Sequence, residues 1–97
     1  MSENKLVKAR TTVFPKLYAT NVLLSETDSD TRIYAFNETF ETDEGQLAVA
    51  EGAIILTDQA TVLLYEQLKS MLEKWESEGK KVIVSEKRRS TLKNLRD

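Results

Sequence analysis

The sequence predicts an α+β domain: an antiparallel sheet of three to four strands packed against one long amphipathic helix, with flexible basic termini. Apolar residues recur at helical spacing through 57–79, whereas segments within 17–56 have the length and composition of strands. Basic residues gather at both ends of the chain and acidic residues in its middle. These three observations predict the fold class.

Length and charge predict the domain limits. A chain of 97 residues is near the commonest size for one domain, so one core is expected. Net charge is +3 over residues 1–16, −10 over residues 17–79 and +5 over residues 80–97. We therefore predict a disordered basic arm over 1–12, a single α+β domain over 13–85, and a basic C-terminal tail over 86–97.

Two strands joined by a polar loop begin the predicted domain. The run 17–24 has strand length and carries apolar residues on both faces, and residues 25–30 are turn formers and acids. Residues 31–40 are interpreted as the second strand, with three aromatic residues on a face expected to point inward: Tyr34, Phe36 and Phe40. Together with Tyr18 and Trp75, these rings are interpreted as core and not as a ligand-binding set.

A hairpin turn precedes the third predicted strand. Asp43-Glu44-Gly45 is a strong turn signal because glycine adopts the positive φ that closes a hairpin. The apolar run 46–56 follows and is interrupted by Glu51-Gly52. This pair is either a bulge within one strand or a two-residue turn between two strands, and we favour the bulge.

The segment 57–79 is the predicted long helix. Thr57 suits the N-cap and Gly79 suits the position just past the C-cap. One apolar stripe runs along the helix: Ala60, Leu64, Leu68, Met71, Leu72 and Trp75. Beyond the helix, 81–84 is a candidate short strand, and Ser85 is a candidate cap for a last helix.

The apolar surface of the long helix predicts self-association. Leu63 lies at the margin of the stripe and Val62 well off it, so this surface is wider than one small sheet needs. A core of this size is marginal alone, which favours a homodimer, with another protein as the alternative partner. The candidate contacts in this interface are Leu63, Leu68, Met71 and Trp75.

Missing residue types argue against catalysis. The chain has no cysteine, hence no disulfide or thiolate, and no histidine, the usual general base near neutral pH. The sequence therefore predicts a non-enzymatic protein with no catalytic, cofactor-binding or metal-ligating residues. The longest apolar run is far short of the roughly 18 residues of a membrane span, and the N-terminus has no signal-type apolar core. These features predict no membrane partner and a cytoplasmic location.

Two acidic clusters resemble cation sites only in part. Glu26, Asp28 and Asp30 alternate as in a calcium loop, but Thr31 and Asn37 stand at its sixth and twelfth positions, where glycine and glutamate are needed. We interpret them as solvated loop acids. A second cluster, interpreted as aiding solubility and protecting a strand edge, comprises Glu38, Glu41, Asp43 and Glu44.

The basic C-terminal end gives an alternative function, nucleic-acid binding through phosphate neutralisation. The tail has no aromatic residue for base stacking, and the acidic body opposes the approach of a duplex. The same charges suit docking on the acidic body of a neighbouring subunit. The candidate nucleic-acid contacts are Lys80, Lys81, Lys87, Arg88, Arg89 and Lys93.

Several short motifs within about 15–78 form a recognisable pattern: Tyr18-Ala19-Thr20-Asn21-Val22, Ile54-Ile55-Leu56-Thr57-Asp58-Gln59-Ala60, Leu64 and Trp75-Glu76. In these residues the chain resembles domain-of-unknown-function family 3467, a family of short bacterial and archaeal proteins. The chain departs from the family pattern at Thr20, which precedes Asn21, at Thr57-Asp58, where Ser-Pro is usual, and at Trp75, where Tyr is common. The resemblance implies a fold and no activity.

Overall fold

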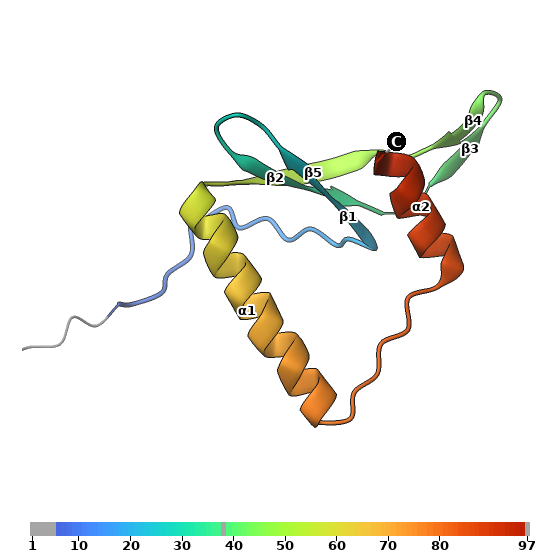
Figure 1. Ribbon diagram of the computed structural model, residues 1–97. Helices are drawn as coiled ribbons and strands as arrows, with labels where there is room; N and C mark the ends of the chain where they lie inside the picture. The colour runs from blue at the N-terminus through green and yellow to red at the C-terminus, as the bar shows by residue number, and fades with distance from the viewer. Residues whose placement is uncertain (1–5, 38, 97) are drawn as a thin grey trace, which may run out of the picture.

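A computed structural model of the chain describes residues 6–37 and 39–96 (Figure 1). Five strands precede two helices: β1 (Asn21–Glu26), β2 (Thr31–Phe36), β3 (Phe40–Thr42), β4 (Gly45–Leu47), β5 (Ala50–Leu56), α1 (Asp58–Ser77) and α2 (Glu86–Arg96). The predicted α+β class is confirmed. Part of the predicted basic arm (residues 1–5), one acid of the second acidic cluster (Glu38) and the last residue of the tail lie outside the described residues.

The larger sheet has three antiparallel strands in the order β1-β2-β5. The strand β1 begins and ends later than the predicted 17–24, because the turn occupies only the last four residues, 27–30, of the polar loop 25–30. There Thr27 N–H donates to Asp30 O at 2.9 Å, and Thr27 Oγ1 accepts from Asp30 N–H at 3.1 Å. These two bonds close the connection between β1 and β2.

The predicted bulge at Glu51-Gly52 is confirmed within β5. Ala35 pairs with Gly52 and Phe36 pairs with Ala50, so Glu51 is the extra residue on the bulged strand. A Cβ atom at Gly52 would lie 2.5 Å from Leu17 Cδ1, so a larger residue there would displace the Leu17 side chain.

The predicted strands 31–40 and 46–56 are wrong as single strands, because the chain between β2 and β5 forms a separate hairpin of β3 and β4. Thr42 pairs with Gly45, whose φ of +124° confirms the predicted glycine turn. Since Phe40 belongs to this hairpin, it is exposed and does not share the face of Phe36.

Both predicted ends of α1 are confirmed. Thr57 Oγ1 accepts from the N–H of Ala60 at 3.1 Å. At the other end Gly79, with φ +77°, donates its N–H to Glu76 O at 3.0 Å, and Lys80 N–H donates to Trp75 O at 2.9 Å. This pair of bonds is a Schellman motif, which satisfies carbonyls that a helix end leaves free.

The connector after α1 differs from its prediction. Residues 81–84 form no strand, although their composition suits one, because no sheet edge pairs with their backbone in the described part of the chain. The predicted cap is confirmed: Ser85 Oγ accepts from Arg88 N–H at 3.2 Å, and α2 follows. The basic tail is thus helical over 86–96.

Burial in the single chain is slight. Phe36, 8% exposed, is the only apolar residue classed as buried in the described ranges. The predicted packing of the long helix along the sheet is wrong: α1 contacts the sheet mainly at β5, the strand that leads into it, and its far end points away (Figure 1). The Cα radius of gyration is 17.3 Å, against about 12–13 Å for a compact domain of this length.

Candidate interaction surface

One face of the three-stranded sheet is apolar and largely uncovered. By the strand register, this open sheet face carries Val22, Leu24, Ile33, Ala35 and Ile54. Leu24 is 67% exposed, and Val22 and Ile54 are each more than half exposed. Leu17 lies against this face at Gly52.

The opposite face of the sheet is covered in part. It carries Leu23, Tyr34 and the buried Phe36, whereas Ile55 on the edge strand β5 is 60% exposed, and α2 contacts β1. Asn21 Nδ2 donates to Arg88 O at 3.5 Å, which joins the start of β1 to α2. The C-terminal helix therefore lies at the start of β1, where Val22 and Leu92 border one cavity, and Leu24 and Ile54 of the open sheet face stay exposed.

A second uncovered surface runs along α1. The helix stripe, Ala60, Leu64, Leu68, Met71, Leu72 and Trp75, contains no buried residue. Ala60 and Leu64, near the sheet, are half-buried, whereas Leu68, Met71 and Leu72 are exposed. The apolar half of an amphipathic helix thus lies in solvent over its last three turns.

The structure groups three of the four predicted interface residues. Leu68, Met71 and Trp75 lie on the helix stripe, whereas Leu63 lies about 110° from its centre at 100° per residue. Leu63 is 56% exposed and borders a shallow depression with Val62. All four stay predictions as contacts, and Leu24 and Ile54 are exposed apolar residues that the sequence reasoning did not single out.

Trp75 is held at the end of the helix stripe by a cation–π contact. Lys80 Nζ lies 3.7 Å from the centroid of the indole ring. The Schellman motif brings Lys80 back over the preceding turn, so the contact follows from the helix end. Lys80 is therefore part of α1's surface and is separated from the basic residues of α2.

The predicted nucleic-acid contacts are spread over three segments. Arg89 and Lys93 form a basic stripe on α2 together with Arg96, within an arc of about 60°. Arg96 was missed because the prediction rested on charge runs and not on helical spacing. The other four lie at the end of α1, in the connector and elsewhere on α2: Lys80, Lys81, Lys87 and Arg88.

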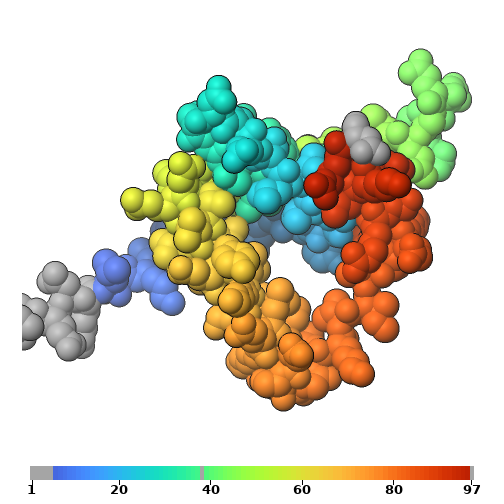
Figure 2. Space-filling view, viewed as in Figure 1, coloured from blue at the N-terminus to red at the C-terminus, as the bar shows by residue number. Residues whose placement is uncertain are grey.

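A cavity of about 650 Å³ separates the start of β1 from the connector and α2. Val82, Ile83 and Val84 form one wall, and Ile83 is 91% exposed. Thr20 Oγ1, also at the cavity, is buried and has no hydrogen-bond partner among the described residues. Figure 2 shows the open space enclosed by α1, the connector and α2.

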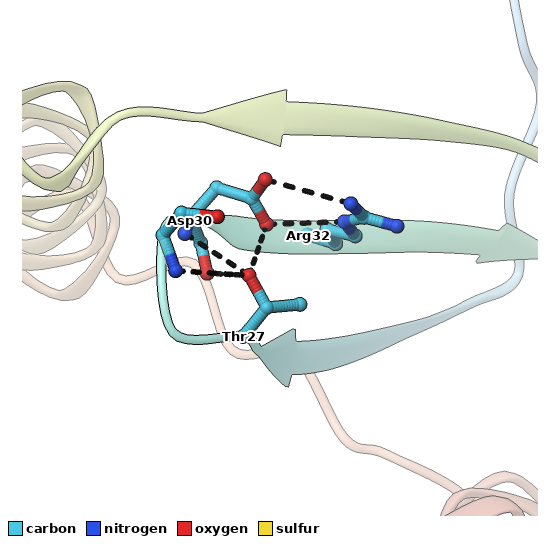
Figure 3. A network of polar contacts seen from close by, with 4 residues as sticks. Thr27, Asp30 and Arg32 are labelled. Atoms are coloured by element: carbon cyan, nitrogen blue, oxygen red, sulfur yellow. Dashed lines mark hydrogen bonds and ion pairs between the residues drawn. The ribbon is translucent and has the colours of Figure 1, made fainter.

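The acidic loop is organised by an ion pair (Figure 3). Asp30 Oδ1 accepts from Arg32 Nε at 3.0 Å and from Thr27 Oγ1 at 2.8 Å. Hydrogen bonds from Arg32 and Thr27 hold the pKa of Asp30 below its usual value. In residues 6–37 and 39–96, no three acidic side chains are grouped so as to hold a metal ion.

Comparisons of the chain with protein-family models, curated proteins and solved structures found no match. Membership of family 3467 therefore stays a prediction. Neither described helix has the length and apolar character needed to cross a bilayer.

Proposed function

We propose that this chain is a non-enzymatic protein-interaction module that folds and acts as a homodimer. The observation that supports it is the small buried core in the described part of one chain. Ordering a residue costs about 1–2 kcal/mol of backbone entropy, which folding offsets mainly by burying apolar surface. In the described part of one chain only Phe36 among the apolar residues is fully buried, and a partner surface would supply the further burial that favours folding.

The exposed area fits a second copy as this partner. The chain exposes 9230 Å², whereas a compact monomer of its mass exposes about 5,700 Å². Obligate dimers bury about 1,000–2,500 Å² on each chain. The excess provides this area and leaves a remainder for the first described residues, drawn in blue, which extend away from the body in Figure 2.

The chemistry of the exposed surfaces also suits a permanent interface. The helix stripe has no charged residue, and the open sheet face carries charge only at its edge beside the turn, where Glu26 pairs with Thr31. Depletion of charge marks the centres of such interfaces. We further propose a cytoplasmic location, where a chain without cysteine needs no oxidising environment.

Light scattering of the full chain at low and high salt tests this proposal. A mass of twice 11.1 kDa at both salt concentrations is expected, because apolar contacts are not screened. A folded monomer under both conditions would refute it.

Nucleic-acid binding is the second candidate, supported by the basic stripe on α2. Phosphate contacts of this kind lose affinity steeply as salt rises. We expect the full chain to bind a labelled duplex, measured by fluorescence anisotropy, only at low salt. The triple substitution Arg89→Gln, Lys93→Gln and Arg96→Gln should abolish that binding without changing the mass of the dimer.

A further inference from the structure

We infer that the two copies exchange their long helices, so that the helix stripe of each copy covers the open sheet face of the other. This inference rests on the proposed homodimer and names the surfaces that form it. Both surfaces are apolar, both are exposed in one chain, and each chain contains one of each.

The junction between β5 and α1 holds the helix away from its own sheet. Thr57 is the only residue between the two elements. Its Oγ1 accepts from Ala60 N–H at 3.1 Å, and its carbonyl oxygen accepts from Thr61 N–H at 2.9 Å and from Thr61 Oγ1 at 2.8 Å. These bonds begin the helix directly at the end of β5, and a connection of one residue leaves no loop through which α1 could turn back over its own sheet.

Because α1 points away from its own sheet, the exposure of its apolar residues increases with distance from the sheet. Ala60 and Leu64, in the first two turns, are half-buried beside the sheet, and the stripe is exposed from Leu68 onwards until Trp75. Trp75 is half-buried at the far end, where Lys80 lies over its ring. The part of the stripe that needs a cover is therefore the part that its own sheet does not reach.

The dimensions of the two surfaces agree. From Leu68 to Trp75 the helix rises about 11 Å at 1.5 Å per residue. The three strands of the sheet, about 4.8 Å apart, place β1 and β5 about 10 Å from each other. The exposed stripe can therefore cross all three strands and contact Leu24 on one edge strand and Ile54 on the other.

Two-fold symmetry limits the assembly formed by this exchange to two copies. In an isologous dimer, a contact from helix to sheet occurs twice, so both uncovered surfaces of both copies are covered at once. A dimer built from two facing α1 helices would leave the open sheet face in solvent. That residual patch, with Leu24 at 67% exposure, favours the exchange over contact between helices.

Cross-linking through introduced cysteines tests the exchange, because the chain has none of its own. Single variants are made on the open sheet face (Leu24→Cys and Ile54→Cys) and on the helix stripe (Leu68→Cys and Met71→Cys). Two variants per surface allow for a position that disturbs folding, which far-UV circular dichroism and light scattering check beforehand. Lys69→Cys, on the polar side of α1, is the matched control.

Pairs of variants are unfolded together, refolded and treated with a short bismaleimide. We expect cross-linked dimer from mixtures of a sheet variant with a helix variant, at several times the yield of either variant alone or of mixtures with Lys69→Cys. Equal or higher yield from Met71→Cys alone would overturn the exchange while leaving the homodimer intact. In the double variant Leu24→Cys/Met71→Cys, a link confined to monomer would also overturn it. Loss of dimer mass for the unmodified chain would overturn the proposed function itself.

Discussion

Leu68 lies at the middle of the helix stripe and provides the most quantitative test of the interface. Its side chain is 43% exposed in the single chain. Burying a whole leucine side chain is worth about 1.5–3 kcal/mol, so covering the exposed part contributes about 0.6–1.3 kcal/mol per copy. Two copies meet in each dimer, and Leu68→Ala should therefore weaken the dimer by about 1.3–2.6 kcal/mol. This loss corresponds to an increase in Kd of about 10- to 80-fold.

Dilution followed by sedimentation equilibrium measures this change in Kd. Lys69→Ala is the matched control because it lies on the polar side of the same turn and also gains the small helix propensity of alanine. We expect its effect on the dimer to stay within about 0.5 kcal/mol. Equal dissociation constants for the two variants would refute the assignment of the helix stripe to the interface.

Three further predictions concern the local structures that hold the two surfaces. Thr57→Ala should lower the free energy of unfolding by about 1 kcal/mol per copy because it removes the N-cap acceptor. Thr57→Ser keeps a hydroxyl acceptor and should retain most of that stability, and urea unfolding of the two variants measures the difference. Gly79→Ala should cost about 1–2 kcal/mol per copy, because alanine is strained at φ +77°, with a lower melting temperature as the readout. The pKa of Asp30 is lowered in the folded state, so its ion pair stabilises the fold above the unfolded pKa of about 3.9, and this contribution is lost as the pH falls through the folded pKa. Asp30→Asn should therefore show a weaker loss of stability on acidification than the parent chain, and an unchanged acid profile would contradict the role of the pair.

Local signals in the sequence predicted the parts of the fold that local interactions determine. Thr57 and Gly79 mark the ends of α1 through hydrogen bonds within the same turns, and Gly45 and Glu51 mark a hairpin and a bulge. Each of these features depends on a few neighbouring residues. Their chemistry is therefore visible in the sequence.

The features that sequence reasoning missed depend on contacts between distant segments. The composition of 81–84 suits a strand, but a strand also needs an edge to pair with. The division of 31–40 and 46–56 between two sheets likewise depends on where β2 and β5 stop pairing. The open sheet face became apparent only once the register placed Leu24, Ile33 and Ile54 side by side.

The central claim is that one copy completes the core of the other. The dependence of the unfolding midpoint on protein concentration tests this claim most directly. Urea unfolding of the full chain is followed by far-UV circular dichroism over a hundredfold range of concentration. If folding is coupled to dimer formation, the unfolding midpoint should rise by roughly 0.5 M urea for each tenfold increase in concentration. A cooperative transition with the same midpoint at all concentrations would show that a single chain folds alone, and would contradict the account.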